Sequence, residues 1–203
     1  MSDVIRELFF PTPIYFCDVD NSKEINNKLI KNILKWKEED ENGIVRSNNL
    51  GWHSPIDMKI REEFQFFVEI IYNIQNKIAI AEEYKSSLEM VLDNMWANVS
   101  QKYAYNSYHI HPNSLWSGVY YVQSPPNCGN IKFGSRETQC FKKPIYEKDV
   151  PPEHQWPEVQ YQPIEGRVIL FPSWLGHEVE QNLTDVEGSD GYRISISFNT
   201  IQQ

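Results

Sequence analysis

Side chains that commonly carry chemistry are scarce in this sequence of 203 residues, which has three cysteines and five histidines. Cys17, Cys128 and Cys140 are odd in number and include no C-x-x-C pair. This pattern argues against a disulfide framework and against a thiolate zinc site, although the spacing of Cys128 and Cys140 does not exclude a bond between them. We interpret all three as reduced thiols, which predicts a cytoplasmic protein.

Long apolar runs are missing as well. No stretch approaches the roughly 18 apolar residues that a transmembrane helix needs. The first ten residues contain acidic side chains and no apolar segment of the secretory type. We therefore expect neither a membrane span nor a cleaved signal.

Positive charge is in deficit: 19 lysines and arginines stand against 28 acidic residues, which gives a formal net charge of −9. Because proteins bind the phosphate backbone mainly through cationic side chains, nucleic acid is not expected as a partner. The hydrophobic content of 40% is far above that of disordered chains. Length and composition together predict one soluble domain, residues 1–203.

Apolar periodicity changes near position 90, and two amphipathic helices are expected before it. The first follows Asn21, which together with Glu24 resembles a capping box. The second follows Pro55 with Asp57 as its N-cap, and its apolar stripe favours a helix laid across a sheet over a coiled coil. That stripe comprises Ile60, Phe64, Phe67, Ile71, Ile74, Ile78 and Ala81.

Beyond position 90 the pattern becomes short runs of period two, rich in aromatic and β-branched residues and separated by turn residues. Strands of this kind predict a sandwich, barrel or jelly roll over residues 91–203, with residues 1–90 as its helical support. Residues 135–162 are polar and proline-rich, and a loop of this length is a candidate lid over a substrate. The expected strands are 93–104, 107–111, 115–123, 129–134, 166–172, 176–182 and 191–200.

Two histidines stand at alternate positions in the run YHIHP at 108–112. Side chains two apart on an extended strand project from the same face, so His109 and His111 are expected to point together. His177 begins a later predicted strand. Three such ligands can hold one face of a metal ion and leave the other open for substrates. Taken alone, an H-x-H pair is more often a coincidence of surface or core histidines.

The two remaining histidines are expected to have other roles. His53 lies in a Trp-His-Ser-Pro run, where a structural part in a loop is favoured over a place at the mouth of a site. His154 lies in the proline-rich loop and is expected to be exposed. Tryptophans and tyrosines near the H-x-H run, Trp96 among them, are expected in core packing.

The last predicted strand has one polar and one apolar face. A guanidinium can hold a carboxylate through two hydrogen bonds, and a neighbouring hydroxyl can donate to the same oxygens. The alternative is a surface strand with an arginine in a salt bridge. The polar face comprises Arg193, Ser195, Ser197 and Asn199.

Together these segments resemble the 2-oxoglutarate- and Fe(II)-dependent oxygenases of the prolyl-hydroxylase-like superfamily. The resemblance implies a mainly β fold, a double-stranded β-helix (jelly roll) with N-terminal helices packed on the sheet. It also implies a mononuclear Fe(II) centre and 2-oxoglutarate as co-substrate. The segments that carry it are 10–15, 51–54, 96–98, 106–114, 117–122, 129–133, 166–177 and 193–199.

Position by position, the resemblance makes His109 the first metal ligand and His177 the distal one. His111 stands where the superfamily normally has Asp or Glu, and we expect it to be the third ligand. Imidazole is a good ligand for ferrous iron, but it leaves the site one negative charge short, which changes metal affinity and redox poise. With three histidines, the expected site resembles the iron sites of cupin dioxygenases.

The same comparison implies a binding site for the distal carboxylate of 2-oxoglutarate. Arg193, 16 residues after the distal histidine, matches the carboxylate-binding arginine, and Ser195 completes an Arg-x-Ser pair. Tyr121 resembles the tyrosine that prolyl-hydroxylase-like enzymes direct at this carboxylate.

The leading hypothesis is therefore an oxygenase that couples decarboxylation of 2-oxoglutarate to succinate with oxidation, in most such enzymes hydroxylation, of a small-molecule or peptide substrate. A second hypothesis is a cupin-like three-histidine iron dioxygenase that does not use 2-oxoglutarate. A third is a non-catalytic jelly-roll binding module.

Overall fold

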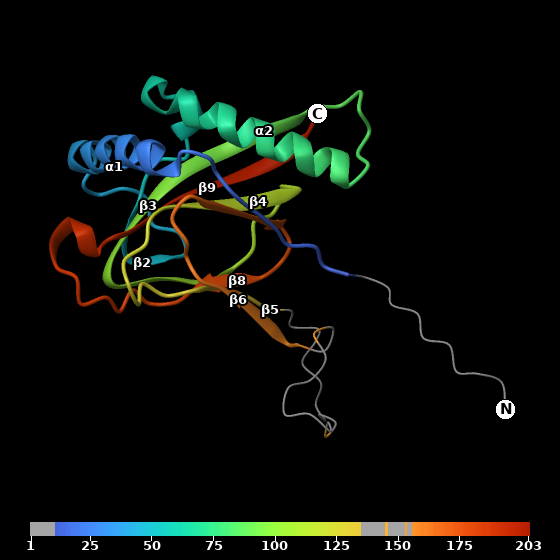
Figure 1. The fold of residues 1–203 in the computed structure, drawn as a ribbon. Helices are drawn as coiled ribbons and strands as arrows, with labels where there is room; N and C mark the ends of the chain where they lie inside the picture. Colours follow the sequence, from blue (N-terminus) through green and yellow to red (C-terminus); the bar gives the residue numbers. More distant parts are fainter. Residues whose placement is uncertain (1–10, 135–144, 146–152, 154–155) are drawn as a thin grey trace.

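The protein is mostly β, with two helices packed on a curled antiparallel sheet (Figure 1). The computed structural model describes residues 11–134, 145, 153 and 156–203. Within these residues no helix is long and apolar enough to cross a membrane. The elements are β1 (Tyr15–Asp18), α1 (Ser22–Glu39), β2 (Asn48–His53), η1 (Met58–Ile60), η2 (Glu62–Phe64), α2 (Gln65–Ala81), β3 (Met90–His109), β4 (Trp116–Gln123), β5 (Ile131–Gly134), β6 (Glu158–Tyr161), β7 (Arg167–Pro172), β8 (His177–Val179), η5 (Gly188–Gly191) and β9 (Arg193–Gln202).

The sheet has the strand order β1-β7-β4-β9-β3-β8-β5-β6, and β2 pairs with β3 beside this path. Strand β3 joins two layers because its first part pairs with β9, whereas its end pairs with β8. Figure 1 shows β8, β5 and β6 on the side of the β3-β9-β4 layer that faces away from the helices. A cavity lies between the two layers.

Both helices lie across the outer face of the β3-β9-β4 layer, as the apolar stripes predicted (Figure 1). Most residues of these stripes are buried in one core together with residues of the strands. Two residues of the second predicted stripe are not: Ile60 lies in η1 and is 74% exposed, and Ala81, the last residue of α2, is also exposed. Burial of a large apolar side chain contributes about 1.5–3 kcal/mol, so this core holds the helices to the layer that carries the cavity. The buried helix residues include Leu29, Ile33, Trp36, Phe67, Ile71, Ile74 and Ile78.

Strand β9 has one apolar and one polar face, which lie on opposite sides of the layer. Ile194, Ile196 and Phe198 belong to the core under the helices. The polar residues between them line the cavity on the other face. Because side chains alternate along a strand, one apolar face fixes the direction of the polar one.

The helix starts differ from those expected. Asn21 lies in the left-handed region (φ 54°) and its side chain makes no capping hydrogen bond. Instead, its carbonyl accepts from the backbone N–H of Glu24. Two 3-10 turns, which bury Met58 and Phe64, precede helix α2, and the helix begins at Gln65 with Phe64 at its N-cap position. Asp57 is therefore not its N-cap.

The strand pattern also differs in four places. The two expected strands 93–104 and 107–111 are one continuous strand, β3. Strands β1 and β2 fall in the part expected to be helical. Strand β6 falls within the expected loop 135–162 and pairs with β5. The proposed lid otherwise lies largely outside the described residues, as does His154.

Candidate metal and co-substrate site

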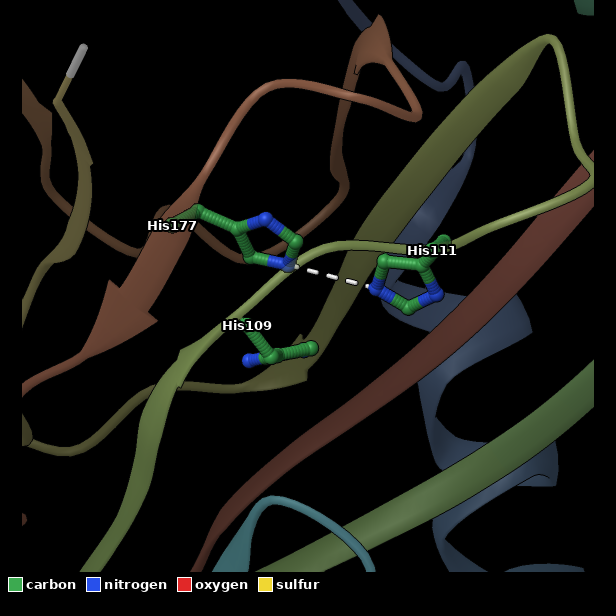
Figure 2. Close-up of side chains that lie close together, drawn as sticks. All are labelled: His109, His111 and His177. Atoms are coloured by element: carbon green, nitrogen blue, oxygen red, sulfur yellow. Dashed lines mark hydrogen bonds between the residues drawn. The ribbon is translucent and has the colours of Figure 1, made fainter. Parts of the chain in front are cut away.

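Three histidines meet at the end of the cavity where β3 and β8 pair (Figure 2). His109, the last residue of β3, lies directly opposite His177, the first residue of β8. His111 follows the end of β3, and its backbone N–H donates to the carbonyl of Ser173 over 2.9 Å. One ring nitrogen from each histidine lies within 4.8 Å of the others. The structure therefore brings together all three residues that the sequence suggested as ligands.

Backbone carbonyls fix the ring orientation of two of these histidines. The Nδ1 atom of His109 lies 2.7 Å from the carbonyl oxygen of Ser107, and that of His177 lies 3.0 Å from the carbonyl oxygen of Leu175. Because a carbonyl oxygen only accepts, each Nδ1 carries the proton. Each Nε2 then presents a lone pair, which is the form that binds metals.

The imidazoles of the cluster are held in the neutral form. Burial lowers the pKa of His177 to about 3 and that of His111 to about 4, and the neighbouring histidines add to the effect. The Nε2 atoms of these two residues lie only 3.3 Å apart (Figure 2). Neutral nitrogen donors this close, with open space beside them, suit a divalent transition metal such as iron.

The cavity extends from the histidines over about 610 Å³. Arg193 lies on its wall and is buried, with 2% of its surface exposed. Its Nη1 atom donates to the carbonyls of Cys128 and Glu180. These bonds fix the guanidinium in place. The alternative of a surface strand with a salt-bridged arginine does not hold.

Two buried donors on the cavity wall lack partners among the described residues: Nη2 of Arg193 and the hydroxyl of Tyr121. Burial raises the pKa of Tyr121, so its hydroxyl keeps its proton. Ser195 lies directly opposite Tyr121 in the β4-β9 register and lines the same wall. Buried polar groups nearly always have a hydrogen-bond partner, so this wall is suited to an acceptor such as a carboxylate.

A family model described as "Putative 2OG-Fe(II) oxygenase" matches residues 94–199, just over half of the chain. The chain belongs to this oxygenase family. It is accordingly an enzyme, an oxidoreductase that uses Fe(II) and 2-oxoglutarate. This finding favours the leading hypothesis over the cupin-like dioxygenase and the binding module. No curated protein sequence matches the chain significantly.

Solved structures of other oxygenases share the fold. A prolyl-4-hydroxylase from Pseudomonas putida has a TM-score of 0.62 at 14% identity, with 93% of this chain and 92% of that chain covered. A prolyl hydroxylase from Trichoplax adhaerens, in complex with a hypoxia inducible factor peptide, has a TM-score of 0.61 at 13% identity and coverages of 92% and 82%. HygX from Streptomyces hygroscopicus, with nickel, 2-oxoglutarate and hygromycin B bound, has a TM-score of 0.58 at 11% identity and coverages of 93% and 82%. The expected fold class, mainly β with a jelly-roll core and flanking helices, is confirmed.

The oxygenase cavity also contains two residues that the sequence analysis assigned to structural roles. His53, at the end of β2, is buried and stacks on Trp96 with an interplanar angle of 10°. Trp96 in turn stacks on His111 at 23°. His53 and Trp96 both line the cavity, because β2 pairs with β3 beside the histidine cluster. No strand was expected at β2, and the sequence analysis favoured a structural part in a loop for His53 over the alternative, a place at the mouth of a site.

The nearby carboxylates are not alternative ligands. Glu178 and Glu180 lie on β8 or just beyond it, outside the cavity lining. Glu180 forms a salt bridge with Lys132 over 2.8 Å. Among the described residues, the possible metal-binding cluster consists of histidines alone.

Proposed function

We propose that this oxygenase binds Fe(II) through His109, His111 and His177. The proposal is supported by the convergence of their ring nitrogens and by the two carbonyl bonds that direct Nε2 into the cavity. With three neutral ligands, the site leaves both positive charges of the ion uncompensated. We expect this to strengthen its attraction for anionic co-substrates.

The distal carboxylate of 2-oxoglutarate is assigned to the wall formed by Arg193, Tyr121 and Ser195. The observation that carries this assignment is the pair of buried, unpartnered donors in the cavity that contains the histidine cluster. The guanidinium is fixed by its two carbonyl bonds before any ligand binds. Little conformational freedom is lost on binding, which favours affinity.

Fe(II) together with 2-oxoglutarate supplies the oxidising chemistry of the class, in which decarboxylation to succinate is coupled to oxidation of a substrate. The protein positions the reacting groups and keeps water out of the site. The carbonyl bonds orient the histidines, Arg193 and Tyr121 orient the diacid, and the two sheet layers restrict water. The proposed outcome is hydroxylation of a small molecule or a peptide. The free thiols of Cys17 and Cys128 support a cytoplasmic location.

Anaerobic titration tests the assignment of the carboxylate wall. Fe(II) and then 2-oxoglutarate are added to metal-free protein, and the visible charge-transfer band of the chelated complex is followed. We expect Arg193→Met to weaken 2-oxoglutarate binding about a hundredfold, because a charge-assisted hydrogen bond to the carboxylate is lost. Fe(II) binding is expected to stay unchanged.

Arg167→Met is the matched control, because Arg167 pairs with Asp18 outside the cavity lining. It should leave both titrations as in the wild type. Equal 2-oxoglutarate affinity in the wild type and in Arg193→Met would contradict the proposed wall. Absence of the band in the wild type would contradict the metal site as well.

A further inference from the structure

The cavity differs in charge from the rest of the chain. Acidic residues make up 28 of the 203 residues. None of the described residues that line the cavity is acidic, and two of them, Arg46 and Arg193, are cationic. Among the described residues, the cavity where the proposed function binds 2-oxoglutarate is thus lined without negative charge, and it contains a second arginine that this binding does not use.

Arg46 lies on the histidine side of the cavity. Its neighbour Ser47 has its Oγ 3.4 Å from Nε2 of His109 and accepts a hydrogen bond from Asn106. The carbonyl of Ser47 also accepts from the backbone N–H of Ser107 over 2.9 Å. The backbone that carries Arg46 is therefore fixed beside the first metal ligand.

The side chain of Arg46 is exposed at the cavity mouth. None of the salt bridges among the described residues involves it. Burial lowers the pKa of His53 on the cavity wall, and the positive charge of Arg46 lowers it further. Arg46 is thus an accessible cation without a carboxylate partner in the described part of the chain.

The sum of the charges in the proposed site indicates the charge of the group that Arg46 binds. Iron held by three neutral imidazoles keeps two positive charges, Arg193 adds one, and the dianion 2-oxoglutarate removes two. One positive charge remains, and Arg46 raises it to two. Excess charge of one sign in a cavity with low-dielectric walls attracts ligands of the opposite sign. A second anion at the mouth would reduce this excess: a carboxylate would remove one positive charge and a phosphate up to two.

The cavity that Arg46 lines also has apolar residues. Ile56, Trp96 and Ile110 line the same cavity, and both isoleucines are about half exposed. A molecule seated here would bring carbon atoms to the histidine cluster while an anionic group reaches the guanidinium. From these observations, and resting on the proposed function, we infer that the primary substrate is an organic anion with an apolar body, and that Arg46 binds its carboxylate or phosphate.

Binding of simple probes tests this inference without requiring turnover. Protein loaded with Co(II) and 2-oxoglutarate is titrated anaerobically with hexanoate, hexyl phosphate and neutral hexanol, and the visible Co(II) bands and tryptophan fluorescence are recorded. We expect both anions to bind more tightly than hexanol. Arg46→Gln should weaken the binding of the anions about ten- to a hundredfold and leave hexanol unchanged. Arg46→Glu should bind hexylamine in preference to hexanoate.

Arg167→Gln serves as the matched control, because it also removes a surface cation, and it should bind the probes like the wild type. Equal hexanoate affinity in the wild type and in Arg46→Gln would overturn the inference. Displacement of hexanoate by chloride at equal concentration would also overturn it. Failure of the wild type to bind Co(II) or 2-oxoglutarate in the first step would instead overturn the proposed function, so the two failures are distinguishable.

Discussion

At the scale of single residues, His111 differs from the other two histidines in how its ring is held. His109 and His177 each donate from Nδ1 to a backbone carbonyl. No hydrogen bond to Nδ1 of His111 occurs among the described residues, and its ring instead stacks on Trp96 with centroids 5.7 Å apart. The indole face of Trp96 therefore supports the ring of His111, the residue that we propose as the third ligand.

This difference predicts the effect of changing Trp96. Trp96→Leu removes the flat surface and should weaken Co(II) binding about ten- to a hundredfold, the usual cost of losing a residue that orients a ligand. Trp96→Phe keeps a flat face and should retain most of the affinity. Metal titration followed by the Co(II) absorption bands measures both. Comparable losses in the two variants would argue against a role in orientation.

The lowered pKa values of the cluster predict that the metal-free protein loses stability in acid. An unfolded histidine titrates near 6.5, whereas His111 and His177 titrate at about 4 and about 3 in the fold. Below pH 6.5 the unfolded chain binds more protons. The stabilising contribution is therefore complete above pH 6.5 and is lost as the pH falls towards 4 and then 3.

Urea unfolding at pH 7, 5.5 and 4.5 measures this loss, which should be on the order of a few kcal/mol. The double variant His111→Gln, His177→Gln lacks these two titrations and should lose less stability over the same range. Parallel pH profiles for the wild type and the double variant would show that other groups, such as carboxylates, cause the acid sensitivity.

At the scale of elements, the close pairing of β4 and β9 depends on a glycine. Gly118 lies opposite Phe198 in the register, and a Cβ atom built on it would lie 2.2 Å from Cζ of that ring. The ring occupies the space that a side chain would need. Both strands also carry the proposed carboxylate wall on their other face, so their spacing bears directly on the site.

Gly118→Ala should therefore lower the free energy of unfolding by about 1–3 kcal/mol, the usual cost of overpacking a core. Gly134→Ala is the control, because the nearest atom to its added Cβ is 3.7 Å away. It should change stability by no more than about 0.5 kcal/mol. Urea midpoints measure both, and equal midpoints for the two variants would contradict the packing argument.

At the scale of the whole molecule, one core joins the two halves of the chain. Helix residues from the first half and strand residues from the second form a single buried cluster. Unfolding of the helices would expose the apolar face of the strands that carry the cavity. We therefore predict that residues 1–203 behave as one domain.

Thermal unfolding of the metal-free protein tests this prediction. Far-UV circular dichroism and tryptophan fluorescence should report one transition at the same temperature. Added Co(II) should raise that temperature in a concentration-dependent manner, because the metal binds only the folded state. Two separate transitions would indicate that the helical part and the strand part unfold independently.

The sequence by itself determined those features that depend on local periodicity. Alternation along the last strand separated Arg193 and Ser195 from Ile194 and Ile196, because side chains on a strand alternate whatever its partners are. Helical spacing likewise identified the faces of α1 and α2 that are buried. The H-x-H run and the surrounding segments indicated the family.

Long-range pairing decided the rest. The β3-β8 register sets His109 opposite His177, and the β2-β3 register sets His53 beside Trp96. Strand β2 is short and has no alternating pattern of its own, so only its pairing with β3 reveals its place at the cavity. The unpartnered Nη2 atom of Arg193 and the lack of acidic residues in the described cavity lining likewise emerge only when distant segments meet, because burial and partners belong to tertiary contacts and not to local sequence.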